Sequence, residues 1–504
     1  MDEHRFQEIV AQLEHDIHAE PKSYRFNVGA LALSMVGLFV LLPVVALTLL
    51  GAGLVALFNA SLTSGIVLAC AALLTFAVWR RTHAIHIQPP NGHALTREDA
   101  PELFKLIAKI RRKQRARAID EVLVTDEYRV SIVRTPRFGP LGRRHVSLVI
   151  GLPFMLTTTR EQFAAIVAHE YAHLTSAHNG FDAWVYRLRG DWARWSQALS
   201  RQPRGGFAWA TWPIRSLVDY FQAYTFLIAR DQEYEADQRA AAFAGRTATA
   251  QALVACSMGS RFYHGRFWPS FWARANNAPE PPELPFSAFR KHMKLLWTDA
   301  SQLKPDLDAA LAKTSTLTDT HPSLRDRLDA LERAATLPTV PKLTAARALL
   351  GELTDTLTRR FDAQWHRDAR ESWAQRYEDV QNDRRTLGHL RSNGASLPVD
   401  ELLRLATLEA SYGDIKNAVE AFQRAIAMAP TLGKARLDYG RFLLACGDES
   451  GLDELDRAIE MDASLISEVT ALGWTFCSRR GMTERAERIH QRFYQMHERH
   501  PQAA

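Results

Sequence analysis

The distribution of apolar and polar positions sets one region of the chain apart from the rest. Between Phe26 and Trp79, about 54 residues include no charged residue and no histidine. A helix crosses a bilayer with about 20 residues. The pattern therefore predicts an N-terminal transmembrane helical hairpin over residues 26–80. The alternative interpretation is a very hydrophobic helical hairpin outside a membrane.

Basic residues flank this apolar region on both sides, with Lys22 and Arg25 before it and Arg80-Arg81 after it. Positive flanks favour retention in the cytoplasm. Four cysteines without a C-x-x-C pair fit a reducing compartment. We therefore expect an integral protein of the inner or plasma membrane in contact with the lipid bilayer. Its N-terminal segment, residues 1–25, and its later domains would be cytoplasmic.

The region after the hairpin alternates between helical and extended patterns. Residues 98–118 have a helical pattern, whereas 121–125 and 145–150 are rich in β-branched residues and are separated by proline and glycine. These patterns predict a mainly α protein with a small β-sheet. An edge strand can pair through its backbone with an extended ligand, so Ser147, Val149 and Gly151 are candidate substrate-binding residues.

A helical pattern follows the second strand and contains the sequence His169-Glu170-Tyr171-Ala172-His173. Residues four apart lie on one face of a helix, so two imidazoles can bind one zinc ion, with the intervening glutamate beside its water. The alternative is an ordinary amphipathic helix, because a five-residue pattern with only three fixed positions, His-Glu-x-x-His, also recurs by chance. A third ligand is needed to decide between the two interpretations.

The third ligand is expected from a second helical segment about 60 residues downstream, where Glu233 and Asp237 share one face. One carboxylate can bind the metal while the other accepts a hydrogen bond from a ligand imidazole. We expect Glu233 to be the ligand and Asp237 to support it. Glu235 points away from that face. The alternative is a solvated acidic helix face.

These motifs, together with His321-Pro322-x-x-x-x-Arg327, resemble the HtpX-like and CAAX prenyl protease family, the gluzincins of metallopeptidase family 48. The resemblance covers roughly residues 85–355. It implies an α+β zincin-like protease domain with one Zn²⁺ per chain. It also implies that His321 and Arg327 line the active site, where we expect them to stabilise the developing oxyanion.

Zinc held by His169, His173 and Glu233 makes its water more acidic, and Glu170 is placed to act as the general base.

Residues 181–229, which are rich in tryptophan and tyrosine, are expected to form a lid or an interfacial helix pair. Burial of these aromatic residues in a core is the alternative. The 62 basic and 56 acidic residues are evenly mixed, which argues against a nucleic-acid partner.

The C-terminal part has an internal period. A charged helical linker, residues 356–397, precedes a region in which Gly413, Gly447 and Gly481 recur every 34 residues. This is the period of tetratricopeptide helix pairs, so residues 398–504 are expected to form an α-solenoid that can bind a partner protein.

Together these patterns predict a membrane-anchored zinc endopeptidase with protein or peptide substrates, acting in membrane protein quality control. The alternative is a catalytically silent membrane scaffold that binds partner proteins through its repeats.

Overall fold

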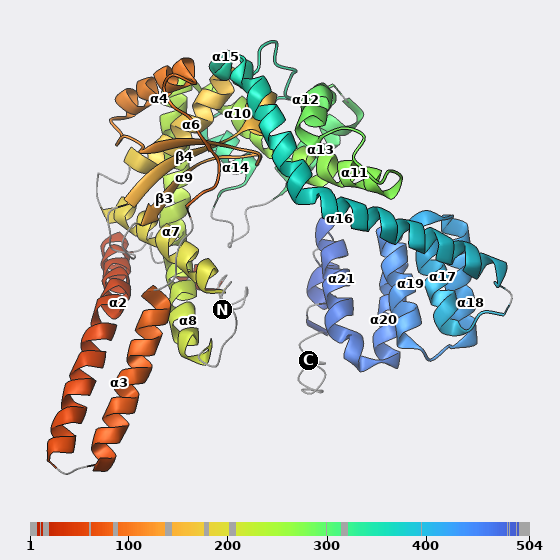
Figure 1. The fold of residues 1–504 in the computed structure, drawn as a ribbon, viewed down its shortest axis with the longest axis horizontal. Coiled ribbons are helices and arrows are strands. Elements are labelled where there is room, and N and C mark those ends of the chain that lie inside the picture. The colour runs from red at the N-terminus through yellow and green to blue at the C-terminus, as the bar shows by residue number, and fades with distance from the viewer. Residues whose placement is uncertain are drawn as a thin grey trace. The chain divides into compact units, whose positions relative to one another are not determined.

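The computed structural model shows a mostly helical chain with one small mixed sheet (Figure 1). It describes residues 8–10, 12–13, 20–59, 62–83, 89–136, 144–175, 181–200, 208–298, 300–313, 321–394, 396–480, 482, 484–489 and 491–492. The chain divides into two compact units. The first comprises Met1–Phe271 and Glu283–Asp368, and the second comprises Trp272–Pro282 and Ala369–Ala504.

Helices make up most of both units. In chain order they are α2 (Pro21–Phe58), α3 (Leu62–His83), α4 (Pro101–Gln114), α5 (Leu152–Thr157), α6 (Arg160–Thr175), α7 (Phe181–Ser200), α8 (Ala208–Tyr224), α9 (Phe226–Ala244), α10 (Arg246–Phe262), the π-helix η2 (Tyr263–Phe267), α11 (Trp268–Ala273), the 3₁₀ helix η3 (Arg274–Asn276), α12 (Pro285–Leu296), α13 (Ala300–Ala312), α14 (Leu324–Ala330), α15 (Ala345–Leu350), α16 (Leu353–Ser392), α17 (Val399–Tyr412), α18 (Ile415–Met428), α19 (Gly433–Ala445), α20 (Gly451–Met461), the 3₁₀ helix η4 (Ala463–Leu465) and α21 (Ile466–Arg479).

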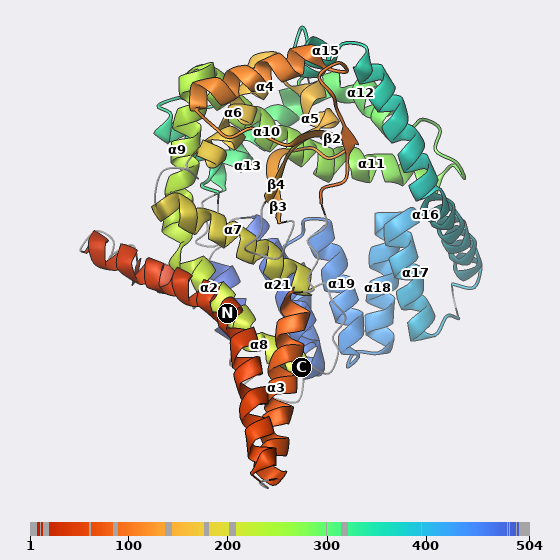
Figure 2. The same ribbon diagram turned by 60° about the vertical axis from the view of Figure 1, so that its left-hand side comes forward.

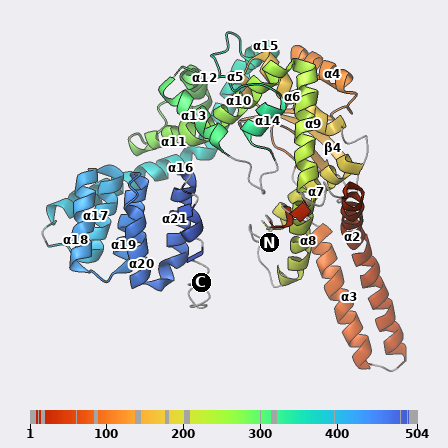
Figure 3. The same cartoon turned by 180° about the vertical axis from the view of Figure 1, so that it is seen from behind.

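The sheet of the first unit has the strand order β1-β2-β4-β3. Its strands are β1 (His93–Ala94), β2 (Glu121–Thr125), β3 (Val130–Pro136) and β4 (Arg144–Gly151). Strand β4 pairs in parallel with β2 and antiparallel with β3, so it lies inside the sheet. Strand β3 is an edge strand among the described residues. Helix α6 packs against β3, and also against α9 and α10, which Figure 3 shows beside it.

The apolar N-terminal region forms α2 and α3, which run side by side (Figures 1 and 2). The predicted transmembrane hairpin is wrong, because no described helix has the length and apolar character needed to cross a membrane. The predicted integral membrane localisation is contradicted by the same finding.

Part of this apolar region is buried in a hydrophobic core of the protein. Val28, Ala32 and Met35 of α2 are buried in one cluster with Trp192 and Trp195 of α7. Burial against protein requires the same apolar composition as burial in lipid, so composition could not separate the two. The cluster also shows that these two tryptophans are core residues, which is the alternative to the expected lid or interfacial pair.

The second unit consists of successive helices that pack on their neighbours in the chain. Helix α17 packs against α18, and α19 against α20. Phe422 of α18 is buried and lies 5.5 Å, between ring centroids, from both Tyr439 and Phe442 of α19. Gly481, the third glycine of the predicted period, lies outside the described residues. The assignment of tetratricopeptide repeats and the predicted domain boundaries stay predictions.

Candidate metal centre

The helix that carries the two histidines begins with a reciprocal pair of hydrogen bonds. The Thr159 backbone N–H donates to Gln162 Oε1 at 2.9 Å, and the Gln162 backbone N–H donates to Thr159 Oγ1 at 3.2 Å. Such a capping box satisfies N–H groups that have no partner in the first helical turn. Helix α6 then continues to Thr175, so His169 and His173 lie one turn apart on one face.

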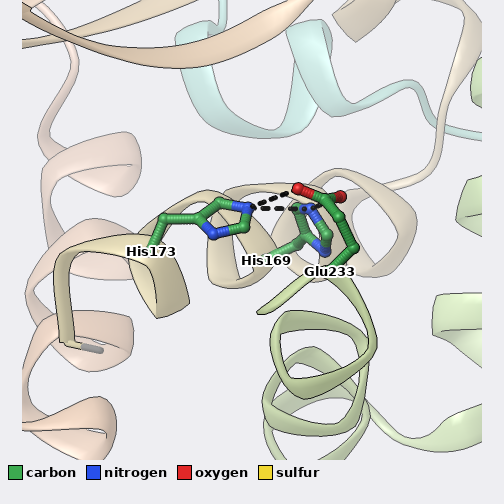
Figure 4. Close-up of side chains that lie close together, drawn as sticks. All are labelled: His169, His173 and Glu233. Carbon is green, nitrogen blue, oxygen red and sulfur yellow. Dashed lines mark hydrogen bonds and ion pairs between the residues drawn. The ribbon is translucent and has the colours of Figure 1, made fainter. Parts of the chain in front are cut away.

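Helix α9 brings Glu233 to these histidines. His169 Nε2 lies 3.5 Å from Glu233 Oε2, and His173 Nε2 lies 3.4 Å from Glu233 Oε1. The two Nε2 atoms are 3.3 Å apart. Figure 4 shows the three side chains converging, and their ligand atoms lie within 4.8 Å of one another. The structure thus brings together the three residues that the sequence proposed as ligands.

Asp237, one turn after Glu233, supports His169 from the other side. Its Oδ1 lies 2.9 Å from His169 Nδ1, so the opposite ring nitrogen, Nε2, faces Glu233. Asp237 is fully buried. A carboxylate on the outer nitrogen of a ligand histidine fixes its tautomer and its orientation.

Arg327 occupies a different place from the one expected. Its Nε and NH2 groups donate to Asp237 Oδ2 and Oδ1, each at 2.7 Å. Both of these donors are therefore used by the carboxylate behind His169. Arg327 is also absent from the lining of the cavity beside the ligands. The structure thus places Arg327 behind Asp237 rather than in the cavity, which differs from the position expected of a residue that stabilises an oxyanion.

His321 does lie at the site, just before α14. Its Nδ1 is 2.7 Å from Glu233 Oε2, and its side chain is 64% exposed and lines the cavity. The ring can therefore donate to Glu233 through Nδ1 while Nε2 is available to a substrate.

Glu170 lines the same cavity as His173 and Glu233. Its Oε2 accepts a hydrogen bond of 3.0 Å from the backbone N–H of Ile132 in the edge strand β3. Burial raises the pKa of Glu170, against the opposing effect of His169. A carboxylate with a raised pKa is a stronger base than one in water.

The ligand atoms fit a divalent cation. Burial lowers the pKa of His169, but hydrogen bonds with Asp237 and Glu233 outweigh it and raise that pKa to about 9. Binding of a proton, and so of a positive charge, is therefore favoured at His169, beside the buried carboxylates of Glu233 and Asp237. Burial lowers the pKa of His173 to about 3, so this imidazole is neutral, as a metal ligand must be. A divalent cation that replaces the proton would satisfy all three donors.

The predicted substrate-binding residues of β4 do not have a free edge. Ser147 and Val149 are fully buried, and their strand pairs on both sides. A side chain at Gly151 would collide with the backbone oxygen of Glu127, so glycine is required there for close packing. These three residues cannot pair with a substrate, and the edge that faces Glu170 belongs to β3.

Two residues of the site were not expected from the sequence. Tyr186 of α7 donates its hydroxyl to Glu233 Oε1 at 3.2 Å and stacks on the His173 ring, with centroids 5.1 Å apart. Arg134 of β3 donates to the backbone oxygen of His173 at 2.8 Å. Neither residue belongs to a recognisable motif or lies at a helical spacing from the ligands, so no local sequence pattern could have identified them.

Two histidines and a glutamate on neighbouring helices, with a second glutamate beside them, define the metal-dependent hydrolase class. The comparisons identify the family within this class. Residues 139–335 match the model of peptidase family M48, and this part of the chain belongs to that family. The protein is therefore a metallopeptidase, with proteins or peptides as substrates. A search of curated proteins finds no match to the chain.

Proposed function

We propose that the protein is a zinc-dependent endopeptidase in which His169, His173 and Glu233 hold one Zn²⁺. The observation that carries this proposal is the convergence of these three side chains, with ligand atoms within 4.8 Å of one another. Two imidazoles and one carboxylate form the ligand set of many catalytic zinc sites, which leave one position for water or substrate.

Glu170 is proposed as the general base. When bound by His169, His173 and Glu233, zinc would supply Lewis-acid chemistry that polarises a carbonyl group and makes water more acidic. Glu170 takes the proton of the attacking water on its carboxylate and then delivers it to the leaving amine. The Ile132 N–H bond to Oε2 holds this carboxylate in the cavity, while the second oxygen, which has no hydrogen bond among the described residues, can accept the proton.

His321 is proposed as the donor to the reacting carbonyl oxygen, through Nε2, because its Nδ1 is 2.7 Å from Glu233 Oε2 and its ring lines the cavity. Tyr186 also lines the cavity, and its single O–H donates to Glu233 at 3.2 Å, so its proposed role is to hold this carboxylate. A donor fixed beside a developing negative charge stabilises the transition state. Arg327 and Asp237 hold His169 in place, and the edge of β3 takes the substrate-pairing role that was predicted for β4.

A comparison of wild type with Glu170→Gln tests this proposal. We expect Glu170→Gln to retain zinc and to cleave casein about 10²- to 10⁴-fold more slowly, the usual contribution of a general base. Glu161→Gln is the matched control, because Glu161 is exposed on the same helix. It should behave as wild type.

Zinc content is measured on the same samples by elemental analysis. Equal cleavage by wild type and Glu170→Gln would contradict the role of Glu170. Purified protein that takes up zinc but cleaves no peptide would favour the silent scaffold instead.

A further inference from the structure

A cavity of about 250 Å³ opens beside the ligands, and one wall of it is basic. Glu170, His173 and Glu233 line one side. Helix α7 and strand β3 supply four arginines, and we call this part of the cavity the arginine pocket. Its arginines are Arg134, Arg187, Arg189 and Arg194.

Most of these guanidinium groups have no carboxylate partner in the part of the chain that the structure describes. Arg134 donates to the backbone oxygen of His173, and Arg189 donates to the Gln222 backbone oxygen and to Thr225 Oγ1. Arg187 makes no ion pair within the described residues. Only Arg194 pairs with an acid, Asp191, at 2.6 Å.

Asp191 is itself shared, because Arg144 lies 2.5 Å from its other oxygen. Among the described residues around this wall, Asp191 is therefore the one carboxylate that forms ion pairs with the arginines. Glu233 is used by His169, His173 and His321, and Glu170, which accepts the Ile132 N–H, forms no ion pair with these arginines within the described residues. Burial, together with Arg144, lowers the pKa of Arg187, as expected for a cation short of negative charge.

The wall also has room for an occupant. A Cβ atom added at Gly190 of α7 would have no heavy atom of another segment within 4 Å. Gly190 and Arg194 follow Arg187 by three and seven residues, so all three lie on one helical face. The pocket is thus open between two arginines whose backbone is held in a helix.

We propose that the arginine pocket binds a carboxylate of the peptide substrate, so that the enzyme prefers an aspartate or glutamate close to the scissile bond. The inference rests on the proposed peptidase function and names its substrate class. Guanidinium groups bind carboxylates through charge-assisted, often bidentate hydrogen bonds. A free C-terminal carboxylate has the same chemistry, and the experiment separates it from a side chain.

The test uses peptides with one Glu, Gln or Lys moved along positions around a single cleavable bond, with amidated C-termini. Binding is measured by fluorescence anisotropy on the Glu170→Gln variant, and kcat/KM on the active enzyme. At the best position we expect Glu to exceed Gln about 10- to 100-fold, the factor contributed by a hydrogen bond to a charged group.

Arg187→Gln should reduce this Glu-to-Gln ratio, and Arg187→Glu should invert the preference between Glu and Lys peptides. Gly190→Leu should reduce the same ratio by filling the pocket. Arg112→Gln removes an equal charge from the exposed face of α4 and should leave the ratio unchanged. An additional pair, a Gln peptide with a free or amidated C-terminus, shows whether the carboxylate comes from the chain end.

In wild type, a ratio near one between the carboxylate-bearing peptide and its neutral counterpart overturns the inference if it is found in both binding and cleavage. This holds for a Glu side chain and for a free C-terminus together, and it holds even if all peptides are cleaved. A ratio that Arg187→Gln leaves unchanged also overturns it. Failure of the peptidase proposal gives a different result, because no peptide is then cleaved while binding can still discriminate Glu from Gln.

Discussion

The metal centre draws on residues far apart in the sequence, whereas the second unit is built from neighbours. His169 and Asp237 are 68 residues apart, His321 and Glu233 are 88 apart, and Arg327 and His169 are 158 apart. In the second unit α17 packs on α18 and α19 on α20, each joined by a short connection.

The two regions also differ in the forces that hold them. The metal centre is a buried network of charges and hydrogen bonds, in which each group depends on its partner. The second unit is held mainly by apolar packing, with clusters built around leucine, alanine and Phe422. Loss of one partner should therefore change function in the first region and stability in the second.

The largest expected effect is on the stability of the second unit. Phe422→Ala removes a buried ring that contacts Tyr439 and Phe442, and should lower the free energy of unfolding by about 3–5 kcal/mol. Chemical denaturation monitored by circular dichroism measures this change. Met428→Ala is the control, because Met428 lies on the same helix but is 57% exposed. Equal stability of the two variants would show that the packing around Phe422 is not what holds this unit.

A smaller effect is expected at the metal centre, where it should appear as binding rather than stability. Asp237→Asn weakens the support of His169 and should reduce zinc affinity about 10- to 100-fold. Competition with a chromophoric chelator measures the affinity. Glu235→Gln, on the same helix and 41% exposed at its side chain, should bind zinc as wild type does. Unchanged affinity in Asp237→Asn would exclude the proposed support.

The smallest expected effect concerns one charged pair in the second unit. Arg391 holds the pKa of Glu409 below its usual range through hydrogen bonds of 2.6 and 2.7 Å. The Glu409 side chain is only 3% exposed, whereas Arg391 is 48% exposed, so we expect Arg391→Met to cost about 1–2 kcal/mol at pH 7.

The pH dependence of this pair has a definite sign. Because the folded-state pKa of Glu409 is lowered, its stabilisation is complete above the unfolded-state pKa of about 4.3 and is lost as the pH falls through the folded-state value. Wild type should lose this contribution in acid, and Arg391→Met should lack it throughout. Arg385→Met, an exposed arginine of the same helix, should retain it. Denaturation curves between pH 3 and pH 7 measure the free energy of unfolding of each protein. If wild type and Arg391→Met lose the same amount of stability in acid, the pair contributes nothing.

Part of the site could be predicted because it depends on helical geometry. The four-residue spacings of His169 to His173 and of Glu233 to Asp237 already place each pair on one face. The direction in which Arg327 points could not be predicted in this way. A motif names the residue, but whether its guanidinium faces the substrate or Asp237 depends on how α14 packs against α9 and α10.

The sequence by itself determined the mostly helical character, the strand at residues 121–125 and the two halves of the ligand set. These features depend on the preferences of neighbouring residues and on the periods of the helix and the strand. Only the tertiary structure decided that Val28 and Met35 pack against protein, that β4 is an interior strand, and that arginines of α7 line the cavity. The burial of a side chain, the place of a strand in its sheet and the charge around a cavity depend on segments that are distant in the sequence. A local sequence pattern therefore cannot predict them.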